Sequence, residues 1–211
     1  MHQETNYTAI VLKKQPINEA DEIITVYSLE GGKIRALAKS VKLPKSKLQN
    51  ILQSGFEVKL ELVQGKNLKT IIGGQVLNAF RGFREDLEKF KNASVALEML
   101  LKLTPDEQPN GEVYENLKNF FMALEQPINV VPALLKYKII FLKALGLNPL
   151  RDQYLLARKN LLLIAQHLEV AEYGQWSNLD NNHLVLDLQT WLTTFISYNL
   201  DREIKSDKFV V

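Results

Sequence analysis

The spacing of the apolar residues changes once along this chain of 211 residues, near residue 81. Before that point apolar and polar residues alternate, as in 33–39 and 56–63. Beyond it, apolar residues return every three or four positions, as in 84–103. A period of two is typical of a strand with one buried face, and a period near 3.6 is typical of an amphipathic helix. We therefore expect a β-domain followed by an α-domain.

The N-terminal part contains five candidate strands bounded by turn residues. They are rich in β-branched, aromatic or alternating apolar residues and cover 7–14, 21–28, 33–39, 56–63 and 68–80. The pair Gly73–Gly74 predicts a bulge or a sharp bend in the last strand. Five short strands with one longer connection, roughly 40–55, predict a small, partly open barrel of the OB type. An SH3-like barrel fits the same pattern almost as well.

The C-terminal part is predicted to be helical, with helices at 84–103, 112–125, 132–145 and 181–206 and a less regular stretch between the last two. Pro132 suits a first helical turn, and Gly146 suits a C-terminal stop. In the first helix, the residues expected near one face are Leu87, Phe90, Val95, Leu97 and Leu101. The predicted fold class is α+β: an OB-fold barrel over 1–80 and an all-α domain over 81–211.

Residues that usually carry catalysis are sparse in this chain. There is no cysteine, which excludes disulfides, thiolate zinc sites and a cysteine nucleophile. His2, His167 and His183 are scattered and form no pair at metal-ligand spacing. No phosphate-binding loop, nucleophile elbow or dinucleotide fingerprint occurs. We expect a protein that is not an enzyme and that needs no metal or cofactor.

Three acids near the start of the first predicted helix allow two interpretations. Glu85, Asp86 and Glu88 could hold a metal ion, or they could stabilise the positive end of the helix dipole. We favour the helix terminus, because acids are common there.

The remaining outlier is a basic segment, "GGKIRALAKSVKLPKSK" at 31–47, which contains no acid. Residues 1–80 carry 11 Lys and Arg against 7 Asp and Glu, whereas the rest carries 15 against 17. Side chains two apart on a strand are about 7 Å apart, comparable to phosphate spacing along an extended strand of nucleic acid. The candidate phosphate contacts, all in this segment, are Lys33, Arg35, Lys39, Lys42, Lys45 and Lys47. A solvated strand face with a lysine-rich loop is the structural alternative.

Several stretches, taken in order, resemble the bacterial DNA repair protein RecO family. "AIVLKKQPINEADEIITVYSLEGGKIRALAKSVKLPKSKL" resembles the family's opening, with its "E-x-D" segment, glycine turn and "GK-x-R-x-x-AKG". "NAFRGFREDLEKF" resembles the passage from barrel to first helix, "LLKYKIIFLKALGLNP" its "LG-x-x-P" helix, and "YNLDREIKSDKF" its C-terminal "LKS".

The resemblance implies a fold and a function, with DNA binding by the OB-fold over 1–80 and partner binding by the helical domain over 81–211. RecO proteins have an N-terminal OB-fold and a helical domain, bind single- and double-stranded DNA and anneal complementary strands. They act with RecR to load RecA onto strands coated by single-strand-binding protein (SSB), and many contact the SSB C-terminal tail. The matching basic positions are Lys33, Arg35, Lys39, Lys45 and Lys47, and Lys42 is an extrapolation.

One departure concerns zinc. Many members carry a four-cysteine zinc module after the "LG-x-x-P" helix, whereas this chain has "LNPLRDQYLLARKNLLLIAQHLE". We expect apolar packing to hold that segment instead, through Leu155, Leu156, Leu161, Leu162 and Ile164. Candidate charges for an acidic tail in the helical domain are Lys136, Lys138, Lys143, Arg151, Arg158 and Lys159, which ordinary exposed lysines would explain equally well.

The function expected from these observations is that of a non-catalytic DNA-binding and strand-annealing mediator of recombination. One alternative is an adaptor for RecR and SSB with weak or no DNA binding, and another is an RNA-binding barrel protein. A metal-dependent nuclease is a remote fourth. The chain shows neither a secretory signal nor an apolar run of about 18 residues. We therefore expect a cytoplasmic, nucleoid-associated protein without membrane contact.

Overall fold

The computed structural model describes residues 4–176, 179 and 183–210, and the chain divides into two compact units. The barrel unit comprises residues 1–80 and 104–114. The helical unit comprises residues 81–103 and 115–211. Each unit has its own elements and core and is described by itself. The roles predicted for the two parts of the chain, DNA binding and partner binding, stay predictions.

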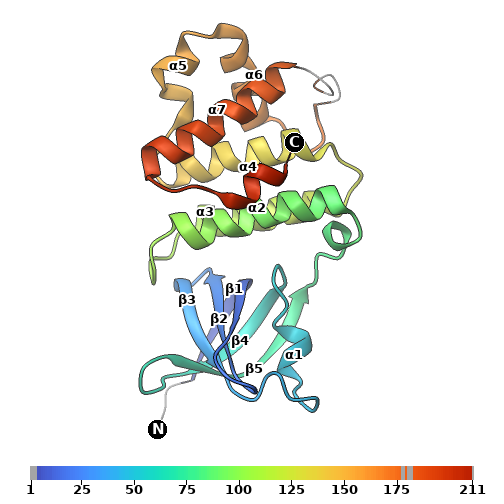
Figure 1. Cartoon of the computed structure of the whole chain (residues 1–211), viewed down its shortest axis with the longest axis vertical. Helices are drawn as coiled ribbons and strands as arrows, with labels where there is room; N and C mark the ends of the chain where they lie inside the picture. Colours follow the sequence, from blue (N-terminus) through green and yellow to red (C-terminus); the bar gives the residue numbers. More distant parts are fainter. Residues whose placement is uncertain (1–3, 177–178, 180–182, 211) are drawn as a thin grey trace. The chain divides into compact units, whose positions relative to one another are not determined.

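The barrel unit is a closed five-stranded barrel (Figure 1). Its strands are β1 (Glu4–Pro16), β2 (Glu22–Ser28), β3 (Gly32–Ala38), β4 (Glu57–Val63) and β5 (Lys69–Asn78). The strand order is β1-β2-β3-β5-β4, with β1 paired to β4, and β3 and β5 run parallel while the other pairs are antiparallel. This arrangement fits the predicted OB type, although the barrel is closed rather than partly open.

The barrel core follows the predicted alternation. Ile34, Ala36 and Ala38 of β3 face inward, as do Val58 and Leu60 of β4. Further core residues come from the other strands and from the loop before β4: Tyr7, Ala9, Val11, Ile24, Val26, Val41, Leu52, Leu62 and Ile71. The short helix α1 (Leu48–Ile51) and Phe56 pack against this cluster.

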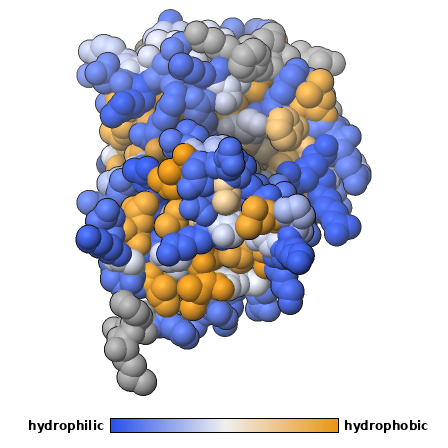
Figure 2. Space-filling view, turned by 60° about the horizontal axis from the view of Figure 1, so that its bottom comes forward, coloured by the Kyte–Doolittle hydropathy of each residue, from blue (hydrophilic) through white to orange (hydrophobic). Residues whose placement is uncertain are grey.

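Strand β5 contains two irregularities that expose apolar side chains. Its register against β4 shifts between Gly73 and Ile71 and again between Asn78 and Val76, so Ile72 and Leu77 have no opposite residue. Ile72 and Leu77 are each 47% exposed, and Val76 is 39% exposed. Figure 2, which brings the barrel side forward, shows orange apolar atoms among the blue polar surface. Of the bulge or sharp bend predicted at Gly73–Gly74, the structure has a bulge, and it lies at Ile72 beside the first glycine.

Residues 104–114 belong to the barrel unit although they follow the first long helix. The phenolic hydroxyl of Tyr114 donates to Oε1 of Glu57 at 2.9 Å, and the hydroxyl of Tyr27 donates to the carbonyl of Asn110 at 3.5 Å. Gly32 has a positive φ of 67°, and a Cβ there would lie 2.3 Å from the carbonyl oxygen of Gln108. Glycine is thus required at this turn both by the backbone conformation and by the close approach of the segment.

Within the described residues, the helical unit contains four long helices of its own, most of a fifth, and several short ones. The long helices are α2 (Leu87–Leu103), α4 (Val130–Ala144), α6 (Lys159–Val170) and α7 (His183–Leu200). Helix α3 (Gly111–Leu124) begins in the barrel unit's segment, and the short elements are η1 (Gly82–Arg84), η2 (Pro149–Arg151), α5 (Gln153–Leu156) and η3 (Lys205–Phe209). Within the described ranges, no helix is long and apolar enough to cross a membrane.

The helix boundaries follow the predicted signals. Pro132 lies in the first turn of α4, and Gly146, at φ +82°, follows the last turn. The amide of Gly146 donates to the carbonyl of Lys143, which satisfies one of the free carbonyls at the helix end. Asp86 precedes α2 and accepts hydrogen bonds from the amides of Glu88 and Lys89. The acids near residue 86 thus include a helix cap, as favoured above.

Two sequence-based expectations for the helical part are wrong, and a third is confirmed only in part. The predicted single helix over 181–206 ends at Leu200, because Asp201 has a left-handed φ of 46° that an α-helix cannot contain. Leu87 and Phe90 of α2 are exposed, and the buried face consists of Asn92, Ala93, Val95, Ala96, Met99 and Leu100. Leu155 and Leu161 are buried where zinc-bearing members have their module, but Leu156 is exposed.

Candidate nucleic-acid interface

The six basic residues predicted to contact phosphates belong to β3 and to the loop that follows it. Strand β3 ends at Ala38, so only Lys33 and Arg35 lie within the strand. The other four lie in the loop between β3 and α1: Lys39, Lys42, Lys45 and Lys47. Because this loop is not extended, the six do not form one regular row, and each side chain has its own environment.

Arg35 faces away from the barrel core. Its neighbours Ile34 and Ala36 are 2% and 0% exposed, and the alternation of the strand directs Arg35 outward, where it is exposed. In the part of the chain that the structure describes, no carboxylate lies within ion-pair distance of Arg35. Its charge is therefore available to a ligand, and its contact with phosphate stays a prediction.

Lys33 has a different environment from Arg35, although both belong to β3. Its Nζ donates to the carbonyl of Thr104 at 2.6 Å and lies 3.2 Å from the carboxylate of Asp106, and its side chain is only 11% exposed. Its own carbonyl accepts a hydrogen bond from the amide of Glu107. The expectation that Lys33 offers its charge to solvent is therefore wrong, because this residue joins β3 to residues 104–107.

Lys42 is exposed but also has a structural contact. Its Nζ donates to the carbonyl of Asn18 at 3.0 Å, and its amide donates to the carbonyl of Ala20 at 3.0 Å. These bonds join the loop after β3 to the loop between β1 and β2. One of the three ammonium hydrogens is thus used within the protein, and two remain for a ligand.

Asp21 organises the exit from β3. Its Oδ1 accepts the amide of Ser40 at 2.7 Å, and Ser40 has a left-handed φ of 53°. The hydrogen bonds from Ser40 and from the Asn18 side chain, with a smaller contribution from the charge of Lys39, lower the pKa of Asp21. The carboxylate therefore stays ionised and fixes the turn that carries Lys39, while it offsets part of the positive charge there.

A groove of about 740 Å³ lies between the end of β3 and the loop that joins β4 to β5. It is lined by Lys39 on one side, by Lys66 in the β4–β5 loop, and by Thr70 and Ile72 of β5. Lys66 is exposed and was absent from the sequence-based set. In an OB-fold the loops around the middle strands border the ligand groove, so the predicted topology could have pointed to Lys66.

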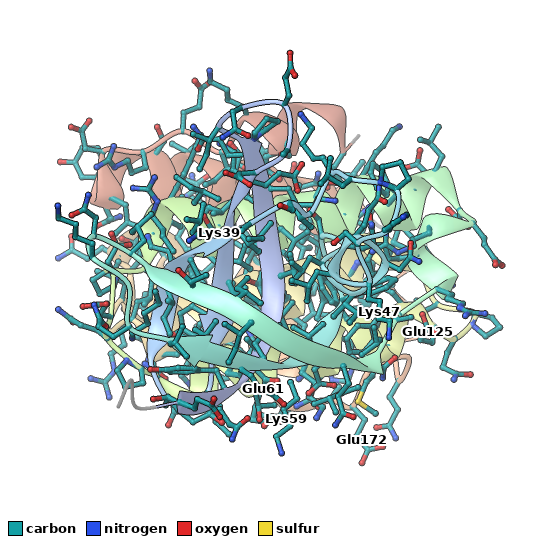
Figure 3. All side chains as sticks on the ribbon, turned by 90° about the horizontal axis from the view of Figure 1, so that it is seen from below. Lys39, Lys47, Lys59, Glu61, Glu125 and Glu172 are labelled. Atoms are coloured by element: carbon teal, nitrogen blue, oxygen red, sulfur yellow. The ribbon has the colours of Figure 1, made fainter. Side chains whose placement is uncertain are left out.

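The remaining loop lysines, Lys45 and Lys47, are exposed. Figure 3, which views the barrel from below, shows Lys47 well separated from Lys39. It also shows Lys59 and Glu61 close together, where two exposed residues of β4 carry opposite charges. This pair of residues therefore adds no net positive charge to the outer face of β4.

Four of the six candidate cations of the helical unit make contacts within the protein. Lys136 donates to the carbonyls of Leu168 and Glu169, Lys138 pairs with Asp207, and Lys143 pairs with Glu169. Lys136 and Lys138 are buried, so the expectation that they edge an open groove is wrong. The exposed members of the set are Lys143, Arg151, Arg158 and Lys159, and the guanidinium of Arg158 donates to the carbonyl of Tyr154 at 3.3 Å.

The chemistry available around the barrel groove is that of cations and hydrogen-bond donors. Across the described residues, no cluster of three or more His, Cys, Asp or Glu side chains is placed to hold a metal ion. His167 lies exposed on α6. Cations spread along a groove bind phosphates through charge and without reading bases.

Comparisons with known proteins cover most of the chain. Residues 1–80 match the family model for the N-terminal part of recombination protein O, and residues 84–153 match the model for its C-terminal part. The DNA repair protein RecO of Gloeothece citriformis is 30% identical over 155 residues, which cover 72% of this chain and 55% of that protein. The RecO protein of Bacillus mycoides is 29% identical over 143 residues, which cover 68% and 58%. The chain thus spans about half the length of these curated relatives.

The two family models meet close to the end of the barrel strands. The first model ends at residue 80, as does the first stretch of the barrel unit, and the second begins at residue 84. Together they cover more than half of the chain, in the order in which the family has them. The chain therefore belongs to the RecO family of DNA repair and recombination proteins.

Proposed function

We propose that this protein is a non-catalytic DNA-binding mediator of recombination that anneals complementary strands and helps RecR to load RecA onto SSB-coated single strands. The single observation that carries the DNA-binding part is the groove of the OB-type barrel bordered by Lys39 and Lys66, with Arg35 exposed on the same strand as the groove's edge. Lys45 and Lys47 add exposed charge in the adjacent loop. Membership of the RecO family supports the repair role.

Annealing by such a surface needs no side-chain chemistry. Two complementary strands repel each other through their phosphates, and cations that neutralise these phosphates lower the repulsion. Base pairing then supplies the free energy of the product. A surface that contacts the backbone leaves the base edges exposed for pairing, and it accepts single and double strands of any sequence.

The proposed partners are RecR and the C-terminal tail of SSB, in addition to DNA. Support for both partners comes from membership of the RecO family, because the resemblance to that family implies them. Each partner can be tested separately from DNA, since purified RecR and a synthetic tail peptide can be added to the intact chain.

The decisive experiment is a titration of a labelled single strand over a salt series. If Arg35, Lys39, Lys45, Lys47 and Lys66 each neutralise one phosphate, log K against log[salt] should have a slope of roughly −3.5. The double variant Arg35→Glu/Lys39→Glu should weaken binding to every sequence by about the same factor and flatten the slope. A flat slope in the wild type would contradict phosphate binding.

The control is a second double reversal that changes the net charge equally. Arg202→Glu/Lys205→Glu changes two exposed cations of the helical unit and leaves the barrel intact. We expect its affinity for DNA to stay within about twofold of the wild type. An equal loss in both variants would show that net charge rather than the barrel groove governs binding.

A second candidate function is that of an adaptor whose barrel binds protein. The observation in its favour is the exposed apolar set of β5, Ile72, Val76 and Leu77, which no sequence argument anticipated. A pull-down with RecR and with the SSB tail peptide, beside DNA binding at moderate salt, separates an adaptor from a DNA-binding mediator. Competition between RNA and DNA strands of one sequence tests the RNA-binding alternative.

A further inference from the structure

The helical unit contains a groove of about 800 Å³ between α5, the start of α6, and α7. We call it the helical groove and define it by Tyr154, Arg158, Lys159, Trp191, Phe195 and Tyr198. Its volume lies within the range of sites that bind small molecules or single groups of larger ligands. The groove is separate from the barrel surface proposed above, because all of its residues belong to the helical unit.

One wall of the helical groove is a stack of flat side chains. The rings of Tyr154 and Trp191 are parallel within 5°, with centroids 6.0 Å apart. The guanidinium of Arg158 lies 3.5 Å from the centroid of the Tyr154 ring, and Phe195 packs against Trp191 at 5.3 Å. These contacts hold Tyr154 in place and direct a cation to the edge of the groove.

Tyr198 is the aromatic residue of the helical groove that is open to solvent. It is 87% exposed, and it follows Trp191 by seven residues on α7, so both lie on the same side of the helix. Among the described residues, none makes a ring contact with Tyr198. A ring in this position offers its face to a ligand in the groove.

The polar residues of the groove favour a ligand with both flat rings and phosphate. Arg158 and Lys159 are exposed cations, and Asn160 and Asn199 supply amide donors and acceptors. Asp152 and Asp187 also line the groove, so its net charge is near zero. Asp152 caps α5 by accepting the amide of Tyr154. Such a balance favours stacking with one or two phosphate contacts over the binding of a strongly acidic peptide.

We propose that the helical groove is a stacking site for an unpaired base of single-stranded nucleic acid, with Tyr198 as the stacking platform and Arg158 and Lys159 as the contacts for the adjoining phosphate. The inference takes the class of ligand from the proposed function and assigns a second contact, in the other unit of the chain. The barrel then contributes affinity through charge–charge contacts with phosphates, and the helical groove contributes affinity through base stacking.

The test compares two strands that differ only in their bases. Binding of the intact chain is measured for an oligothymidylate of about 16 nucleotides and for an abasic strand of the same length. Because stacking on one aromatic residue is worth about 1–3 kcal/mol, Tyr198→Ala should weaken oligothymidylate binding by about fivefold to 150-fold. Its affinity for the abasic strand should stay unchanged. Tyr198→Phe, which keeps the ring, should bind both strands within twofold of the wild type.

Controls separate this inference from the proposed function. Phe90→Ala removes an exposed aromatic ring of α2 outside the groove and should leave both affinities unchanged. Arg35→Glu/Lys39→Glu should weaken binding to both strands by the same factor. If only this result fails, the proposed barrel surface is contradicted and the helical groove is not. Unchanged oligothymidylate binding in Tyr198→Ala, or an equal loss for both strands, would overturn the stacking site. The proposal would also be overturned if the fluorescence of Trp191 changed on addition of an acidic Phe-ending peptide and did not change on addition of oligothymidylate.

Discussion

The basic residues at the barrel groove and those in the core of the helical unit have opposite surroundings. In the barrel unit Arg35, Lys39 and Lys66 are exposed, and Lys39 and Lys66 line a groove. In the helical unit Lys136 and Lys138 extend inward, and Lys138 is fully buried against Asp207. A basic residue therefore reveals its role only through its surroundings, since a buried cation needs a partner whereas an exposed one is available to a ligand.

The largest expected effect concerns the buried pair. Nζ of Lys138 lies 2.6 and 2.8 Å from the two carboxylate oxygens of Asp207, which also accepts a hydrogen bond from Thr193. Burial lowers the pKa of Lys138, an effect that the Asp207 charge partly offsets. Asp207→Ala should lower the free energy of unfolding by about 3–5 kcal/mol, because it leaves a buried charge unpaired. Urea unfolding measures this change.

The matched control is Asp201→Asn, which removes an exposed negative charge between α7 and η3 and keeps a side chain that tolerates the left-handed backbone. We expect it to change the free energy of unfolding by less than about 0.5 kcal/mol. The double variant Lys138→Met/Asp207→Leu should recover most of the loss, since it removes both charges together. If Asp207→Ala proved as stable as the wild type, the claim that Lys138 depends on a buried partner would be contradicted.

Lys33 is the exception within the barrel unit and provides the second prediction. Lys33→Ala removes the hydrogen bond to Thr104 and the ion pair with Asp106, and should cost about 1–3 kcal/mol of unfolding free energy. DNA affinity should stay within about twofold of the wild type, as judged by the salt titration. Arg35→Ala, two residues away, should give the reverse: reduced affinity with a stability change below about 0.5 kcal/mol. Similar behaviour of the two variants would refute the distinction.

The third prediction concerns the pH dependence of the free energy of unfolding, to which Glu98 of the helical unit contributes. Burial alone would raise the pKa of Glu98, but hydrogen bonds from Lys102, Ser206 and the amide of Lys205 outweigh it and lower the pKa to about 2. Because the folded pKa lies below the ordinary value of 4.5, Glu98 contributes stability above pH 4.5 and loses that contribution as the pH falls toward 2.

Glu98→Gln should therefore be less stable than the wild type at neutral pH, and the difference should shrink as the pH falls through this window. Urea unfolding at several pH values measures the difference. A difference that stays constant from pH 6 to pH 2.5 would contradict the assignment of the shift to Glu98.

The smallest expected effect is that of a single groove cation. Lys66→Gln removes one charge from the loop between β4 and β5 and should reduce the magnitude of the salt slope by about 0.7 for a single strand. Stability should change by less than about 0.5 kcal/mol. Lys13→Gln, which changes an exposed lysine of β1, is the control and should leave the slope unchanged. An equal change in both variants would show that the groove has no special part in binding.

Local patterns predicted much of the fold and part of the site. The alternation in 33–39 placed Ile34, Ala36 and Ala38 inside and Arg35 outside, because the strand period is a property of the backbone. Gly146 and Pro132 marked the limits of α4 for equally local reasons. The end of α7 at Leu200 escaped prediction, since the helical pattern of apolar residues continues past Asp201 and no proline or glycine interrupts it.

Contacts between distant parts of the chain could not be predicted in this way. Lys33 is engaged by Thr104, which lies 71 residues later, and Lys138 is paired with Asp207, 69 residues later. A charge run identifies which residues are basic but not which of them find a partner on folding. Lys66 was missed for a related reason, because it lies far from the basic segment in sequence and near it only in the barrel.

The segment 104–114 has a practical consequence for anyone who wishes to cut the molecule into pieces. A fragment that stops at residue 80 would deprive Lys33 of Thr104 and Glu57 of Tyr114, and it would uncover the glycine turn at residue 32. Expression of such a fragment risks aggregation for reasons unrelated to DNA. A fragment in which a linker joins residues 104–114 to the strands is the better starting point for an isolated barrel.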